Sequence, residues 1–315
     1  MTDLVAEARA LTADELAIGV STTAQVTHGS SSPDAALLTA TDPAIREIDK
    51  LRNLFGGVIL TGPPGTSKSW LAGEAARLLT DGDTTRQAFV QFHASYQFED
   101  FMEGFRPKID GSGFEPRDGV FLRLASAAKK DKKHRIHVLV IDELSRADVG
   151  RVFGEALTYV EKTKRGLPFS LPSGKKALVP ENLFIIATMN PLDRGVDDVD
   201  AAFERRFGKI EMLPDAEALQ ARLSDNDVPE ELSRKLVAWF RLINGRSRKT
   251  PAASVGHAYF WSVVDEESLR DVWKYQLKYL VERAFKYDEA TLKEIVSGWN
   301  KIFGDGSTPG VDQES

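Results

Sequence analysis

The sequence predicts an α/β protein in which a parallel β-sheet lies between two layers of helices, with a helical region after it. Short apolar runs of strand length alternate with helical patterns over about residues 43–213. This pattern is typical of parallel sheets that are buried on both faces. A glycine-rich loop joins the first of these runs to a helix, and from Asp215 onward the pattern is helical.

Each predicted element follows from a local pattern. Asp42 before Pro43 predicts the start of a helix, with proline at its first position, and the helix continues to about Leu54. Apolar runs predict strands at residues 58–60, 89–92, 137–141, 183–187 and 210–212. In the helical region, residues 266–303 carry apolar and aromatic side chains at helical spacing, which predicts that these side chains pack in a core.

These elements divide the chain into four parts. The parts are an N-terminal extension (1–42), an α/β core (43–213), a helical subdomain (214–303) and a disordered, Gly-rich tail (304–315). Two inserts in the core, at about 105–121 and 166–180, contain turn residues that predict hairpins. On these inserts, Lys108, Lys175 and Lys176 would either contact a substrate or partner or be solvated.

The composition limits the classes of function. The chain has 315 residues, 42% of them hydrophobic, so it can bury a sizeable core in one large or two smaller domains. Its net charge of −6 excludes a surface that binds polyanions over its whole area. The lack of cysteine excludes disulfides and thiolate chemistry and fits a reducing compartment, so we expect a cytoplasmic protein. We find no signal peptide and no membrane-spanning run in the sequence.

The loop after the first strand has the composition of a phosphate-binding loop. It comprises Gly62, Pro63, Pro64, Gly65, Thr66, Ser67, Lys68 and Ser69, with Trp70 directly after it. Such a loop points backbone N–H groups and a helix N-terminus at one spot, which suits the phosphate chain of a nucleotide. Lys68 would reach the β- and γ-phosphates, and the Ser69 hydroxyl would ligate Mg²⁺. The motif has glycine at the position of Ser67, and a small serine fits there if its φ stays negative.

Later strands end in side chains that phosphoryl transfer needs. Asp142 and Glu143 close the third predicted strand, where one carboxylate can hold Mg²⁺ and the other can orient the attacking water. Asn190 follows the fourth strand and can hydrogen-bond the γ-phosphate or that water. Arg205 and Arg206 precede the last strand, either as a solvated face or as arginine fingers for the nucleotide of a neighbouring subunit.

Together these motifs resemble an AAA+ ATPase, and more narrowly the McrB family, the nucleotide-driven motor subunit of modification-dependent restriction systems. The narrower resemblance rests on residues 93–107, 142–147, 152–155, 189–194 and 256–260, of which the first segment is the longest and most specific. The resemblance covers about residues 43–300. It implies an AAA+ P-loop NTPase core, with its parallel sheet between helices, and a C-terminal helical lid.

The resemblance also implies roles for single residues. The implied catalytic set is Glu143, Asn190, Asp193, Arg146, Arg205 and Arg206. In it, Glu143 is the catalytic carboxylate, Asn190 is a sensor and Asp193 helps to organise the water. The three arginines are candidates to act across a subunit interface. Asp142 supports Mg²⁺ together with the loop serine, and His257 lies where the lid could sense nucleotide.

For the whole protein, the resemblance implies a homo-oligomer, a hexameric ring, that drives an McrC-like nuclease subunit on DNA in host defence. DNA would be reached through that partner or through the pore of the ring. The family signature has Thr-Ala where this chain has Pro191 and Leu192, so we expect ATP as the substrate and keep GTP open. Two alternatives remain: a MoxR-type ATPase that remodels proteins, and a nucleotide-gated scaffold that scarcely hydrolyses.

One basic run lies outside these motifs. Residues 129–135 carry six cationic or histidine side chains around a single aspartate. The run favours a solvated linker over a nucleic-acid patch, because the chain is acidic overall and no aromatic residues interleave with the cations.

Overall fold

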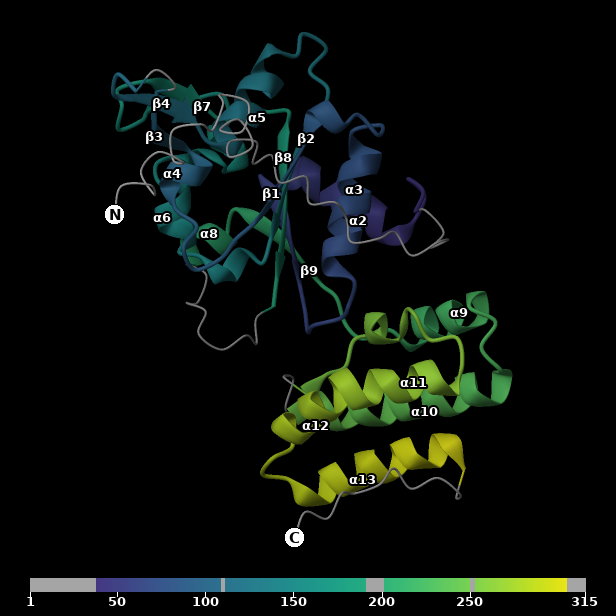
Figure 1. The fold of residues 1–315 in the computed structure, drawn as a ribbon. Helices are drawn as coiled ribbons and strands as arrows, with labels where there is room; N and C mark the ends of the chain where they lie inside the picture. Colours follow the sequence, from purple (N-terminus) through teal and green to yellow (C-terminus); the bar gives the residue numbers. More distant parts are fainter. Residues whose placement is uncertain (1–37, 109–110, 191–200, 250–252, 305–315) are drawn as a thin grey trace, which may run out of the picture. The chain divides into compact units, whose positions relative to one another are not determined.

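A five-stranded parallel sheet forms the centre of the core (Figure 1). The computed structural model describes residues 38–108, 111–190, 201–249 and 253–304. The strands lie in the order β2-β5-β8-β1-β9, and every neighbouring pair is parallel. They are β1 (Gly57–Thr61), β2 (Gln87–Gln91), β5 (His137–Asp142), β8 (Leu183–Met189) and β9 (Phe207–Glu211). The predicted parallel sheet is confirmed, with strand ends shifted by a few residues.

Helices cover both faces of this sheet. The helical segments of the core are α2 (Pro43–Leu54), α3 (Lys68–Leu79), η3 (Thr84–Arg86), α4 (Phe98–Phe101), α5 (Val120–Lys130), η4 (Leu144–Arg146), α6 (Val149–Phe153), α7 (Ala156–Tyr159), η5 (Lys162–Lys164) and α8 (Ala201–Glu204). Because strand side chains alternate between faces, Val58 and Leu60 pack with α2 and α3. Ile59, between them, belongs to the cluster that contains residues of α4, α5 and α6. The sheet is therefore buried on both sides, as its apolar strands require.

Two antiparallel hairpins branch from the core and are tied to each other. They are β3 (Glu103–Pro107) with β4 (Phe114–Asp118), and β6 (Pro168–Ser170) with β7 (Lys176–Leu178). The Glu103 carboxylate accepts hydrogen bonds from the backbone N and the hydroxyl of Ser173, at 3.0 and 2.8 Å. Lys175 Nζ lies 2.6 Å from Asp118, and Lys176 donates to a hydroxyl of β6. Lys175 and Lys176 thus stabilise the hairpins themselves.

The helical region after β9 has its own aromatic core. Its segments are α9 (Ala216–Asp225), α10 (Glu230–Arg246), η6 (Ser247–Lys249), η8 (His257–Phe260), α11 (Glu266–Val272), the π-helical η9 (Trp273–Leu277), α12 (Lys278–Ala284), α13 (Glu289–Asn300) and η10 (Lys301–Phe303). Trp299 stacks on Trp273 with ring centroids 4.7 Å apart and meets Trp239 edge-on at the same distance. The Trp239 indole N–H donates to the Ile295 carbonyl at 3.0 Å, which satisfies its one polar atom. The core role predicted for this apolar stripe is confirmed.

Candidate nucleotide-binding and hydrolysis site

The loop between β1 and α3 surrounds the N-terminus of α3. Gly62 and Gly65 have φ values of 153° and 74°, and a Cβ on Gly62 would lie 2.2 Å from the Met212 carbonyl oxygen. Both positions therefore need glycine. The fully buried Thr66 hydroxyl donates to the Pro63 carbonyl at 2.9 Å and closes the loop. Backbone N–H groups and the helix dipole favour an anion at this spot.

The condition under which serine was expected to fit at position 67, a negative φ, is not met. Ser67 has φ 62° and ψ 23°, the left-handed conformation. Glycine is the residue that adopts this conformation without steric cost. For serine the conformation costs about 1–2 kcal/mol. The serine hydroxyl gains a contact that glycine could not make, because its Oγ lies 3.2 Å from His257 Nε2.

Ser69 and Asp142 meet beside the loop and fit Mg²⁺. The Ser69 hydroxyl donates to Asp142 Oδ1 at 2.6 Å, and the Thr188 hydroxyl donates to the same oxygen. Hydroxyl and carboxylate oxygens are ligands that suit Mg²⁺, which commonly keeps several waters beside few protein ligands. When bound, the ion would neutralise charge on the β- and γ-phosphates. Lys68 Nζ donates to the first two carbonyl oxygens of the loop at 2.9 and 2.8 Å, so its charge is held at the same place.

Glu143 follows Asp142 in a left-handed conformation, with φ 55° and ψ 45°. Its backbone N–H donates to the Thr188 hydroxyl at 3.2 Å, so Thr188 contacts both members of the acidic pair. The Glu143 carboxylate lies 3.1 Å from Arg146 Nε of the same chain. Arg146, predicted as a candidate to act across an interface, thus engages the predicted catalytic carboxylate within its own subunit.

The sheet order brings the sensor candidate between the phosphate loop and the acidic pair. β8 lies between β5, which ends at Asp142, and β1, which leads into the loop. Asn190 directly follows β8 and is buried. The carbonyl oxygen of Met189, the last residue of β8, accepts a hydrogen bond from the Gly62 N–H at 3.3 Å. The polar side chains that the sequence predicted for hydrolysis therefore lie at the carboxyl ends of adjacent parallel strands. Asp193 lies outside the described residues.

The structure separates the two finger candidates. Arg205 is exposed, whereas Arg206 is only 7% exposed. Arg206 Nε lies 3.9 Å from Glu161, and its carbonyl oxygen accepts from the Gly56 N–H at 3.2 Å. Arg206 is therefore built into its own subunit, and Arg205 is the side chain that can reach a neighbour.

The lid reaches the phosphate loop through η8. The Ala258 N–H donates to the Gly65 carbonyl at 2.9 Å, and a Cβ on Gly65 would lie 2.8 Å from the Tyr259 ring. His257 is buried; its Nδ1 accepts from the Asp215 N–H at 3.3 Å, which leaves the ring proton on Nε2, facing Ser67. Burial lowers the pKa of His257, against an opposing effect of Asp215. His257 therefore links the start of α9 to the phosphate loop as a neutral ring.

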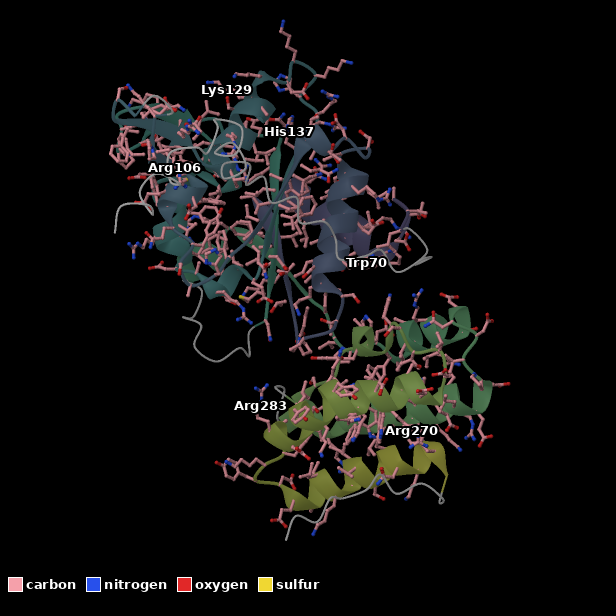
Figure 2. All side chains as sticks on the ribbon, in the orientation of Figure 1. Trp70, Arg106, Lys129, His137, Arg270 and Arg283 are labelled. Atoms are coloured by element: carbon pink, nitrogen blue, oxygen red, sulfur yellow. The ribbon has the colours of Figure 1, made fainter. Side chains whose placement is uncertain are left out.

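Trp70 lies on α3, one residue after the Mg²⁺-ligand candidate Ser69, and its indole is partly exposed (Figure 2). An exposed aromatic ring beside a phosphate loop can contribute apolar contact area to a bound nucleotide. The prediction that it contacts nucleotide stays a prediction.

Sequence reasoning missed Thr188 and Tyr259. Thr188 is a buried polar residue near the end of an apolar strand. The pairing of Ile141 with Ala187 puts Thr188 beside Asp142, so the strand order would have identified it. Tyr259 stands within a segment that the resemblance singled out, but its contact with Gly65 is a through-space fact that no local pattern contains.

Comparison with known proteins agrees with this geometry. Residues 57–207 match the AAA domain of the dynein-related subfamily. The chain is 37% identical over 188 residues to the Type IV methyl-directed restriction enzyme EcoKMcrB subunit of Escherichia coli strain K12, covering 58% of this chain and 40% of that protein. It is 29% identical over 294 residues to the Type II restriction enzyme BsuMI component YdiS of Bacillus subtilis strain 168, covering 76% of this chain and 82% of that component. The chain thus spans less than half the length of the first relative.

The fold and the site define a P-loop protein of the AAA+ class. Within that class the comparisons support an McrB-like AAA+ ATPase. No helix in the described part of the chain is both long and apolar enough to cross a membrane.

Proposed function

We propose that this chain is a ring-forming, Mg²⁺-dependent nucleoside-triphosphate-hydrolysing motor. The observation that carries the proposal is the junction of four residues at one end of the sheet. Ser69 and Thr188 both donate to Asp142, and Thr188 also accepts from the Glu143 backbone. This arrangement supports positioning of a metal-bound phosphate and an attacking water, and phosphoryl transfer needs little more from a protein than such positioning and charge neutralisation.

The ring is part of the proposal because an arginine finger donated by a neighbouring subunit would add positive charge for the transition state of phosphoryl transfer. Arg205 is exposed next to β9 and supports the role of a finger in a neighbour's site. Arg146 lies against Glu143, and a neighbouring subunit could draw it away and so release that carboxylate. An arginine finger in trans raises turnover by about 10³–10⁵ in known P-loop enzymes.

The test is steady-state hydrolysis of ATP and of GTP at several protein concentrations. We expect turnover per subunit to rise with concentration, with ATP as the better substrate and a hexamer as the active form. Lys68→Ala and Arg205→Ala should each abolish turnover while the fold is retained, whereas Arg206→Ala should mainly lower the melting temperature. Tight binding without turnover of either nucleotide would instead support the scaffold alternative.

We further propose that the motor acts in the cytoplasm, in host defence, with an McrC-like nuclease subunit on DNA. Both relatives are named as parts of restriction enzymes, which supports a nuclease as the partner. The test is whether an McrC-like nuclease subunit co-purifies with this chain and whether the pair cleaves DNA, with Lys68→Ala as the inactive control. Recovery of a protein substrate in place of a nuclease would favour the MoxR-type alternative.

A further inference from the structure

A repeated Lys-Tyr pair marks one side of the lid. The pair occurs at residues 274–275, 278–279 and 286–287. A spacing of four residues would put another pair at 282–283, where the chain has Glu282 and Arg283 instead. We call the following side chains the lysine–tyrosine face: Lys274, Tyr275, Lys278, Tyr279, Arg283, Lys286 and Tyr287. It spans the π-helical turn η9, helix α12 and the turn that follows. Arg283 extends from α12 at the edge of the lid (Figure 2).

The tyrosines of this face lie outside the lid core. Tyr275, Tyr279 and Tyr287 are 63%, 65% and 94% exposed, while Leu277 and Val281 of the same helical stretch are buried in the lid core. Exposing three large aromatic rings on one stretch is unusual in a soluble protein and marks an interaction surface. Tyr275 and Tyr279 stand four positions apart, which in a helix corresponds to about 6 Å along the axis, and Tyr287 lies in the turn after α12.

The cations of the face are available for a ligand. None of its three lysines and Arg283 forms an ion pair within the part of the chain that the structure describes. Lys274 Nζ lies 4.8 Å from the centroid of the Tyr275 ring, and Lys286 Nζ lies 5.4 Å from that of Tyr287. Four cations and one carboxylate, Glu282, give residues 274–287 a net charge of +3, in a chain whose net charge is −6.

We propose that the lysine–tyrosine face binds single-stranded nucleic acid. Phosphates would contact the cations, and unstacked bases would stack on the tyrosine rings, as on other sequence-tolerant single-strand surfaces. Protein–protein interfaces enrich tyrosine but deplete lysine, so they match only half of this composition. Duplex nucleic acid keeps its bases stacked on one another and offers no ring faces to the tyrosines.

The basic run at 129–135 is the weaker candidate. Its Arg135 is ion-paired with Asp131 and lies 3.6 Å from Asp83, and no aromatic side chain interleaves. The two surfaces have similar charge, but of the two the lysine–tyrosine face is the one with exposed aromatic rings. The basic run can therefore serve as a control surface.

The experiment measures fluorescence anisotropy of a labelled oligo(dT), about 20 nucleotides long and so longer than one single-strand site, with the full chain. We expect Tyr275→Ala/Tyr279→Ala to weaken binding at least about tenfold, because each lost base stack typically costs a factor of about five or more. Tyr275→Phe/Tyr279→Phe should bind as the wild type does, since phenylalanine keeps the ring. Both tyrosines are exposed, so the alanine variant should keep its melting temperature.

Charge reversal gives a matched pair of variants. Lys274→Glu/Lys278→Glu and Lys132→Glu/Lys133→Glu each change the net charge by −4, two lysines becoming two glutamates. Only the lid variant should weaken binding. The slope of its log affinity against log salt concentration should be shallower by about 1.4, about 0.7 for each lost phosphate contact. Equal loss in both variants, or loss only with Lys132→Glu/Lys133→Glu, would overturn the proposal.

Three further results would overturn it: no binding by the wild type, equal competition by duplex and single strand, or unchanged affinity of the tyrosine-to-alanine variant. If that variant instead changes only the oligomeric state in solution, the face is an interface between copies of the chain. The proposal is independent of nucleotide hydrolysis. Lys68→Ala should bind oligo(dT) normally, so failure of one proposal is distinguishable from failure of the other.

Discussion

The left-handed serine in the phosphate loop allows a sharp test of the reasoning. Ser67→Ala removes the hydroxyl that faces His257 and keeps the strained backbone. His257 Nε2, in a side chain that is only 6% exposed, then lacks its partner, which costs about 1–3 kcal/mol. Ser67→Gly loses the same hydrogen bond but relieves about 1–2 kcal/mol of left-handed strain. Against that relief stands the greater freedom of glycine in the unfolded chain, about 0.5–1 kcal/mol.

The expected order of stability is therefore wild type, then Ser67→Gly, then Ser67→Ala. Taking the middle of each range, the glycine variant should exceed the alanine variant by about 0.8 kcal/mol. Urea-induced unfolding, followed by circular dichroism, measures this difference. Ser126, in the middle of α5, is the control site: there alanine should be more stable than glycine, because the backbone is helical. If Ser67→Ala were as stable as Ser67→Gly, the left-handed assignment and the strain derived from it would be refuted.

Three other changes test separate parts of the structure. Glu143→Gln should retain nucleotide binding and lose turnover, as measured by equilibrium binding and phosphate release, because the amide cannot act as the catalytic carboxylate. His257→Gln should flatten the fall in unfolding free energy as the pH drops below about 6.5; in the wild type the folded-state pKa is lowered, so the unfolded state takes up the proton first and low pH favours unfolding. Arg165→Met should destabilise the fold by more than about 3 kcal/mol in urea titration. The buried Arg165 guanidinium, whose pKa burial lowers to about 10, donates to the carbonyls of Val160, Pro180, Leu183 and Gly56.

Each of these expectations has a result that contradicts it. Unchanged turnover of Glu143→Gln would remove the catalytic assignment. If the unfolding free energy of His257→Gln fell as steeply at low pH as that of the wild type, another group would be responsible for the pH dependence. The first candidate is the buried His137, because burial lowers its pKa as well. Arg165→Met with a loss below about 1 kcal/mol would mean that the four carbonyl groups find other partners.

Much of the nucleotide site could be predicted because its signals are local. The phosphate loop, the acidic pair and Asn190 each stand at the end of an apolar strand, and parallel strands present their carboxyl ends at one edge of the sheet. Once the strands were predicted, these side chains were expected at the same edge of the sheet, and the strand order then made them neighbours. Thr188 escaped prediction because its role depends on which strand neighbours β5, and the sheet order is not encoded in any single segment.

The sequence by itself determined the alternation of strands and helices, the phosphate loop and the class of chemistry, because each depends on residues close together along the chain. The tertiary structure alone decided three other matters: that Ser67 turns left-handed and meets His257, that Arg206 is buried while Arg205 is exposed, and that Lys175 is ion-paired. Burial and partners of a charged side chain depend on segments far away in the chain, so identical local sequence patterns can end in solvent or in a packed interior.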